Sequence, residues 1–113
     1  MTDSRKKGMR GELEAEKVLN SMGVPFIRTY SAQAALGGAD GTTSNDQGLV
    51  KWEVKRCQRP RIYPWVNQVA AACTSDGDIP AVLWRSNRER WLVVLDLEKA
   101  PGWARVMQRY WPV

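Results

Sequence analysis

Glu53 and Lys55 place an acid and a base two residues apart in the run 48–56. Side chains alternate between the two faces of a β-strand, so both would share one face with Lys51, while the apolar residues between them would face a core. With a second carboxylate nearby, this acid and this ammonium group could hold a divalent cation and activate a water for attack on a phosphodiester. The strand therefore indicates a metal-dependent hydrolytic site.

Asp40 is the candidate for the second carboxylate. It ends the run Leu-Gly-Gly-Ala-Asp and precedes a polar stretch at 41–44, which can pair with the Glu53 strand through the tight connection Asn-Asp-Gln-Gly. A hairpin of these two strands would bring Asp40 towards Glu53. Two hard oxygen ligands and the Lys55 ammonium suit a site for one or two Mg²⁺ ions, with Mn²⁺ as a substitute.

The segment 7–19 is predicted to form a helix that ends at Gly23, and 24–30 is predicted to form the first strand. The helix starts on a Lys-Gly pair and carries Glu12 four residues after that glycine. Residues 1–6 are predicted to be disordered. The apolar stripe of the helix is expected to comprise Met9, Leu13, Glu16 or Val18, and Leu19.

These motifs resemble those of a known family. Gly-Ala-Asp, a gap of twelve residues and then Glu-Val-Lys resembles the core motif of the PD-(D/E)XK nuclease superfamily. The Lys-Gly start of the helix, Glu12, the closing glycine and Arg28 on the next strand look like archaeal-type Holliday junction resolvases, and this likeness covers the chain through Lys55. The second half, with its tryptophan-rich tail, looks more like small phage-encoded relatives.

The resemblance implies a role for each residue that matches the motif. Asp40 and Glu53 would bind the metal directly, together with the Val54 carbonyl. Glu12 would reach the metal site from the helix. Lys55 would be the catalytic lysine, which orients or deprotonates the attacking water and stabilises the charge that develops on the phosphate.

Basic and amide side chains around the motif are the candidates for DNA contacts. The resemblance places Arg10 and Arg28 at the DNA backbone, and it places Gln68 on the helix after the catalytic strand, near the scissile phosphate. For Gln68, a surface amide without a role in the site is an equal alternative. Lys51 shares the face of Glu53 and Lys55, and a contact with phosphate or with solvent is an equal alternative to a role in the site. The basic run beyond the catalytic strand favours phosphate contacts, and it comprises Arg56, Arg59 and Arg61.

Composition supports one domain with a polyanionic partner. The chain has 113 residues and 43% hydrophobic content, enough for the single core of one domain over 1–113. Lys and Arg total 17 against 12 Asp and Glu, and this net charge of +5 favours a partner such as DNA. The chain has no histidine, which excludes histidine-based triads and the usual zinc sites. Catalysis would therefore rely on carboxylates, lysine and metal.

Cys57 and Cys73 are expected to be free thiols, because they have neither metal-ligand spacing nor a secretory context. No apolar stretch approaches the ~20 residues of a membrane span, and no apolar signal core follows the basic N-terminus. We therefore expect a cytoplasmic protein with no membrane partner, located in the host cytoplasm if the chain is phage-encoded.

The second half is expected to complete an α/β fold. The elements predicted there, in chain order, are a loop bracketed by Pro60 and Pro64, a helix over 65–73, a stop at 75–78, strands at 80–85 and 90–97, and a short helix after Pro101. The 90–97 strand is mostly apolar and is therefore expected deep in the sheet. By analogy, the order helix, three strands, helix, two strands, short C-terminal helix is restriction-endonuclease-like, with a mixed five-stranded sheet flanked by helices.

Several large or charged side chains have a structural interpretation. Trp52, Trp84 and Trp91 fall within predicted strands and are expected in the core. Glu14 and Glu16 are expected to be solvated. The tryptophans expected to be exposed, where they could serve a subunit interface, are Trp65, Trp103 and Trp111.

The sequence predicts a Mg²⁺-dependent structure-selective DNA endonuclease, with Holliday junction resolution as the favoured activity. Because a four-way junction has two symmetric strands to cut, this activity implies a homodimer with paired sites. Two alternatives stay open. One is a phage nicking or general DNA endonuclease that acts on flaps or duplex, and the other is a non-catalytic basic DNA-binding module with a nuclease-like fold.

Overall fold

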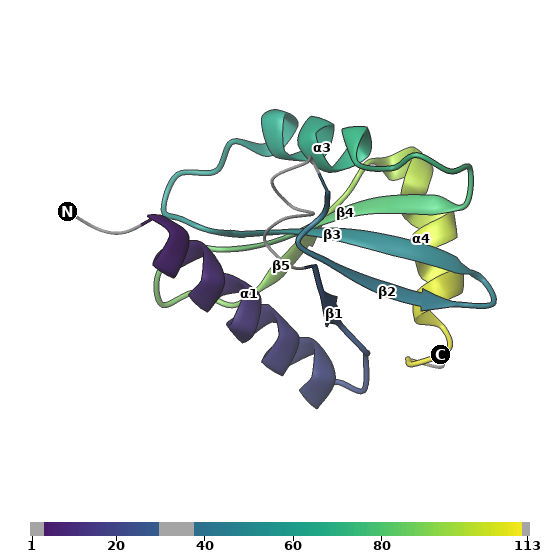
Figure 1. Cartoon of the computed structure of the whole chain (residues 1–113), viewed down its shortest axis with the longest axis horizontal. Helices are drawn as coiled ribbons and strands as arrows, with labels where there is room; N and C mark the ends of the chain where they lie inside the picture. Colours follow the sequence, from purple (N-terminus) through teal and green to yellow (C-terminus); the bar gives the residue numbers. More distant parts are fainter. Residues whose placement is uncertain (1–3, 30–37, 112–113) are drawn as a thin grey trace.

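The computed structural model describes residues 4–29 and 38–111, which form helices on both sides of a five-stranded sheet (Figure 1). Their order confirms the predicted α/β fold of helix, three strands, helix, two strands and C-terminal helix. The elements are α1 (Ser4–Ser21), β1 (Ile27–Arg28), β2 (Gly41–Asn45), β3 (Gly48–Arg56), α3 (Ile62–Ala71), β4 (Asp78–Arg85), β5 (Leu92–Val94), the 3₁₀-helix η1 (Leu97–Lys99) and α4 (Ala100–Met107).

The sheet is mixed, with strand order β1-β2-β3-β4-β5. β3 and β4 run parallel, and the other neighbours run antiparallel. β2 and β3 form a hairpin whose closing pair is Asn45 and Gly48, which confirms the predicted pairing of 41–44 with the Glu53 strand. Helix α3 lies in the crossover connection that a parallel pair of strands requires.

Helices cover both faces of the sheet. α1 and α4 pack on one face, in a buried cluster that includes Leu19, Trp52 and Met107. α3 packs on the other face through Trp65 and Val69. In Figure 1, α3 and α1 lie on opposite sides of the sheet. The apolar residues of β3 belong to the α1 and α4 face, so Lys51, Glu53 and Lys55 share the opposite face, as predicted, and this is the face that α3 covers.

Helix α1 packs through a different stripe from the predicted one. Met9 and Leu13 are 55% and 46% exposed, so their predicted burial is wrong. The buried positions are Gly11, Ala15 and Leu19. A Cβ on Gly11 would make ordinary contact with β3 side chains, which shows how closely the helix lies on the sheet. The helix thus packs largely through small residues, and a stripe chosen from large apolar residues misses them.

The ends of the first two elements differ slightly from the predictions. Helix α1 begins at Ser4, so residues 4–6 are helical rather than disordered, and residues 1–3 lie outside the described residues. Gly23 follows the helix with a φ of +83°, a left-handed conformation that glycine adopts without steric cost, as the predicted helix end requires. Within 24–30, only Ile27–Arg28 pairs as a strand, and residue 30 lies outside the described residues.

Strand β5 is a short edge strand, so the prediction of a long strand deep in the sheet is wrong. Only Leu92–Val94 pairs, with β4 alone, and Leu92 and Val93 are 39% and 38% exposed. The turn before the strand includes Arg88 at a φ of +62°. After the strand, the Asp96 side chain accepts a hydrogen bond from the Glu98 N–H and begins η1. This cap stops the strand despite the apolar sequence.

Pro64 lies within helix α3 rather than at the end of a loop, which corrects the predicted helix start. The helix begins at Ile62, so Pro64 falls in its first turn. Backbone N–H groups in the first turn have no partner within the helix, so a proline there costs no hydrogen bond.

The tryptophans predicted to be exposed are packed instead. Trp65 is 7% exposed in the cluster under α3. Trp103 lies edge-on to Trp52, with ring centroids 6.5 Å apart, and Trp111 lies 6.1 Å from Trp103. Of the three predicted core tryptophans, Trp52 is fully buried and the other two are half-buried. The aromatic rings of Trp52, Trp103 and Trp111 hold α4 and the segment after it on the sheet.

Cys57 and Cys73 are free, as predicted. In the part of the chain that the structure describes, no helix is long and apolar enough to cross a membrane.

Candidate active site

The candidate site lies where β2 and β3 separate. β2 begins at Gly41, opposite Trp52, so the end of β3 beyond Trp52 extends past its antiparallel partner. Asp40 stands at this point. Its N–H donates to the Trp52 carbonyl at 2.9 Å, and its carbonyl accepts from the Thr29 N–H at 2.9 Å. Its Oδ2 accepts from the Val54 N–H at 2.7 Å. Three hydrogen bonds therefore fix both the backbone and the carboxylate of Asp40.

Gly41 makes this geometry possible. A Cβ at Gly41 would overlap the ring of Phe26, which is buried in the core on the α1 face. Only glycine lets the first residue of β2 approach Phe26 this closely. The position of Asp40 thus depends directly on core packing next to it.

Glu53 lies beside Asp40 on β3. It is only 5% exposed, which is unusual for a carboxylate. Lys55 Nζ lies 3.3 Å from Glu53 Oε1, so the predicted acid and base are in contact on one face of the strand. Burial raises the pKa of Glu53 to about 7; the Asp40 charge and a hydrogen bond with Asp40 raise it too, against the lowering effect of Lys55.

Glu12 reaches the same group from α1. Burial raises its pKa to about 7, and the charge of Asp40 and a hydrogen bond with Asp40 add to this rise. The positive charge of Arg28 lowers the pKa of Glu12, and Glu53 raises it. The fold thus brings together Glu12, Asp40, Glu53, Lys55 and Arg28 from helix α1, strand β1, the residue before β2 and strand β3.

The donor set has the chemistry that a divalent cation requires, although its oxygens are otherwise engaged. Across residues 4–29 and 38–111, no three acidic, histidine or cysteine side chains already converge as a metal-binding group. Asp40 Oδ2 is bonded to the Val54 N–H, and Glu53 Oε1 faces Lys55. Burial, and after it the charge of Asp40, nevertheless raise the pKa values of Glu12 and Glu53, and a hard cation would offset both effects.

The Val54 carbonyl is compatible with its predicted place in the ligand set. The N–H and C=O of one strand residue point to the same side. Since the Val54 N–H points to Asp40, the Val54 carbonyl points towards the gap beside β2 as well. It could therefore add a neutral oxygen ligand beside the carboxylates.

Lys51 has structural partners on the α3 side of the sheet. Its Nζ lies 3.1 Å from Asp78 Oδ2 and donates to the Ala72 carbonyl at 2.7 Å. These contacts tie β3 to the start of β4 and to the end of α3. A contact between Lys51 and DNA stays a prediction.

Glu14 is a residue that sequence reasoning missed. It is not simply solvated as predicted, because its Oε1 accepts from Arg85 at 2.7 Å and its Oε2 lies 3.3 Å from Arg56. This network ties α1 to the ends of β3 and β4, and it starts two residues along the helix from Glu12. The pairing joins residues far apart in the sequence, so no local pattern could have revealed it.

The remaining predicted DNA contacts are distributed around the site. Arg28 is partly exposed and lies near Glu12, whereas Arg56 is engaged by Glu14. Gln68 is exposed on α3, and its role near the scissile phosphate stays a prediction. The other predicted contacts are exposed residues, namely Arg10, Arg59 and Arg61.

Comparison of the chain with protein-family models, with curated proteins and with solved structures finds no match. The function must therefore be inferred from the geometry and chemistry of the acidic group and Lys55.

Proposed function

We propose that the protein is a metal-dependent DNA endonuclease, and that its favoured substrate is a four-way junction. The observation that supports this proposal is the group of three carboxylates at the open end of β3 beside Lys55, with the pKa values of Glu12 and Glu53 raised to about 7. A structural role would not require the buried carboxylate of Glu53 to lie next to the half-buried carboxylates of Asp40 and Glu12, which costs energy. A site for a hard cation would require it.

Each residue has a role in this proposal. Asp40, Glu53, the Val54 carbonyl and Glu12 would hold Mg²⁺, and Mn²⁺ could replace it. The ion would supply Lewis-acid stabilisation of phosphate charge and would lower the pKa of a bound water. Lys55, held 3.3 Å from Glu53, would orient that water and donate to the phosphate oxygen on which charge develops. Cleavage is expected to leave 5′-phosphate ends.

The charge of the whole chain favours DNA as the substrate. The net charge of +5 coexists with a local group of acids, a combination that suits a cation held between carboxylate and phosphate. Exposed Arg10, Arg59 and Arg61 are suited to contact the DNA backbone. Resolution of a junction would also need two symmetric sites, and hence a homodimer.

Cleavage of labelled DNA tests the proposal directly. A four-way junction, a flap, a linear duplex and a single strand are incubated with the wild type or with Glu53→Gln, in Mg²⁺, Mn²⁺ or EDTA. We expect symmetric junction cuts that require the metal. The Glu53→Gln variant should cut at least about a hundredfold more slowly, because it loses one charged ligand of the metal that would stabilise the transition state.

Helix α1 offers a matched control pair. Glu12→Gln should lower the cleavage rate, whereas Glu16→Gln on the same helix should not. Cutting spread over flaps and duplex would leave a general or nicking endonuclease. DNA binding without metal-dependent cutting of any substrate would contradict the enzyme and leave a DNA-binding module.

A further inference from the structure

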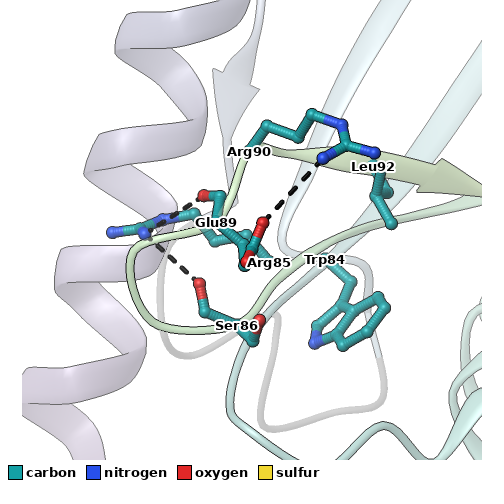
Figure 2. A pocket seen from close by; sticks show the side chains of 6 residues that line it. All are labelled: Trp84, Arg85, Ser86, Glu89, Arg90 and Leu92. Atoms are coloured by element: carbon teal, nitrogen blue, oxygen red, sulfur yellow. Dashed lines mark hydrogen bonds and ion pairs between the residues drawn. The ribbon is translucent and has the colours of Figure 1, made fainter.

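A pocket of about 280 Å³ lies at the end of β4 (Figure 2). Figure 2 shows Trp84 and Leu92 on one side of it, Ser86 and Glu89 on the other, and the Arg90 side chain reaching between them. Arg85 completes its lining. The proposed hydrolysis does not use this pocket.

The pocket is adjacent to Lys55 across the sheet. In the register of the parallel pair, Lys55 is opposite Trp84, and in the next pair Trp84 is opposite Leu92. Register partners share a face, so Lys55, Trp84 and Leu92 form a row across three strands on the α3 side. Neighbouring strands are about 4.8 Å apart, so the row extends only about 10 Å from Lys55.

The indole of Trp84 is held in place before any ligand binds. Its Nε1 donates to the Cys57 carbonyl at 3.0 Å, and its ring lies 6.1 Å from that of Trp65. The Nε1–H is occupied by this hydrogen bond, and Trp65 lies beside the ring. Trp84 therefore presents an apolar aromatic surface to the pocket. A rigid indole of this kind binds a planar ring at little entropic cost.

Other side chains around the pocket suit the remaining parts of a nucleotide. Leu92 is 39% exposed and adds apolar surface beside the indole. The Arg90 side chain is 82% exposed, and its ion pair with Glu89 Oε2 is long, at 3.9 Å, and open to solvent, so a phosphate could replace Glu89 as its partner. Ser86 and Glu89 provide hydroxyl and carboxylate oxygens for the polar edge of a base.

We propose that this pocket receives one unpaired nucleobase of the DNA strand that is cut. The inference rests on the proposed nuclease function and names the feature of the substrate that the protein recognises. The volume is at the small end for ligand pockets, which fits a single base rather than a base pair. Because the phosphates of one strand of duplex DNA are about 3.4 Å apart along the helix axis, the base would lie within about three nucleotides of the phosphate at Lys55.

This assignment explains how a site built for any phosphodiester could select branched DNA. A matched duplex keeps its bases stacked and paired, so it has no base to offer to the pocket. At a junction or a flap the bases next to the branch are less tightly held, and removing one from its stack costs less free energy. The pocket would therefore favour branch points without reading a sequence.

Photo-crosslinking tests the pocket without any need for cleavage. A 5-iodouracil is placed in turn at each of the three nucleotides on either side of the branch of a junction, and the 113-residue chain is bound in EDTA and irradiated. We expect a crosslink at one of these positions, mapped by mass spectrometry to Trp84, and none from the same base in matched duplex. Tyr63, which is 80% exposed on α3, is the internal comparison for non-specific reaction with an aromatic side chain.

Two surface variants supply a test that does not disturb the core. Leu92→Ser and Arg90→Ala should each weaken binding to the junction by about fivefold, the low end of the loss of one base contact, and should leave binding to duplex unchanged. Trp84→Leu should weaken binding to the junction by at least as much. Trp103→Leu is its matched control, because Trp103 packs on the α1 and α4 face and does not line the pocket.

The outcomes separate this inference from the proposed function. Crosslinks that map to Tyr63 or elsewhere, or equal losses of duplex and junction affinity, would overturn the pocket even if cleavage is confirmed. A branch-dependent crosslink to Trp84 in a protein that never cuts would support the pocket and overturn the nuclease. Failure to bind DNA would overturn both.

Discussion

Glu53 couples the protonation of the site to the stability of the fold. Its pKa is raised from 4.5 to about 7 by burial and by Asp40, so between these values the folded protein holds a proton that the unfolded chain releases. The contribution of Glu53 to the free energy of unfolding is therefore complete below about pH 4.5, and it is lost as the pH rises through about 7. The difference is on the order of 3 kcal/mol.

Thermal unfolding in EDTA should show this effect. We expect the Tm to fall between pH 5 and pH 8, and Glu53→Gln, which is neutral at every pH, to reduce the slope. Mg²⁺ should raise the Tm more at pH 8 than at pH 5, because protons compete with the metal for the same oxygens. If the Tm of the wild type did not change with pH in this range, the pKa of Glu53 would be the same in the folded and unfolded states, and the prediction would be wrong.

Gly41 should be intolerant of substitution for a reason of packing. Gly41→Ala would drive a Cβ into the Phe26 ring and should destabilise the fold by about 1–3 kcal/mol. Gly77→Ala is the control, because no atom lies within 4 Å of a Cβ there. Urea unfolding of both variants measures the difference. Equal stabilities would show that Phe26 moves aside freely.

Residue types and spacing predicted that Asp40, Glu53 and Lys55 lie together, but not which residues surround them. Asp40, Glu53 and Lys55 could be identified because they lie on one local hairpin, where register fixes which side chains meet. Glu14 could not be predicted as a partner of Arg85, because their contact depends on how α1 crosses the sheet. The buried environment that raises the pKa of Glu53 is likewise a property of the packed molecule.

At the scale of elements, Glu14 is what fixes α1 against the ends of β3 and β4. Glu14→Gln should lower the free energy of unfolding by about 1–2 kcal/mol, because Arg85, whose side chain is only 14% exposed, loses its charged partner. It should also slow cleavage, since α1 carries Glu12. The exposed Glu89 and Arg90 pair is the comparison, and Glu89→Gln should change stability by less than about 0.5 kcal/mol.

Circular-dichroism melts of the two variants make this measurement. A Glu14→Gln variant as stable as Glu89→Gln would show that α1 is held by its apolar contacts alone.

The elements that were predicted well are those with local signals. The β2 and β3 hairpin has a clear turn, and α3 has a regular apolar stripe. β5 was overestimated, because apolar composition alone does not show that the Asp96 cap ends the strand and that no further strand lies beyond it among the described residues. The stripe of α1 was misplaced because tight helix-to-sheet packing favours Gly11 and Ala15 over larger residues.

At the scale of the whole molecule, a homodimer would need an interface other than the three tryptophans that the sequence suggested for it. Trp65 is buried, Trp103 and Trp111 are half-buried against the core, and Trp111 donates from its Nε1 to the Met22 carbonyl at 2.9 Å. Light scattering with size exclusion, with and without junction DNA, measures the oligomeric state. We expect a dimer, at least on the junction. A monomer that stays bound singly to the junction would contradict resolution by paired cuts.

The parallel pairing of β3 and β4 affects the order in which the chain folds. β2 and β3 are joined by a short turn and can pair early, whereas β4 can join β3 only after α3 has crossed the sheet. Asp40 and Glu53 therefore approach each other before the rest of the sheet is assembled. We expect stopped-flow refolding, followed by tryptophan fluorescence, to be faster at pH 5 than at pH 8. The acidic residues of the proposed site would then also influence the rate at which the chain folds.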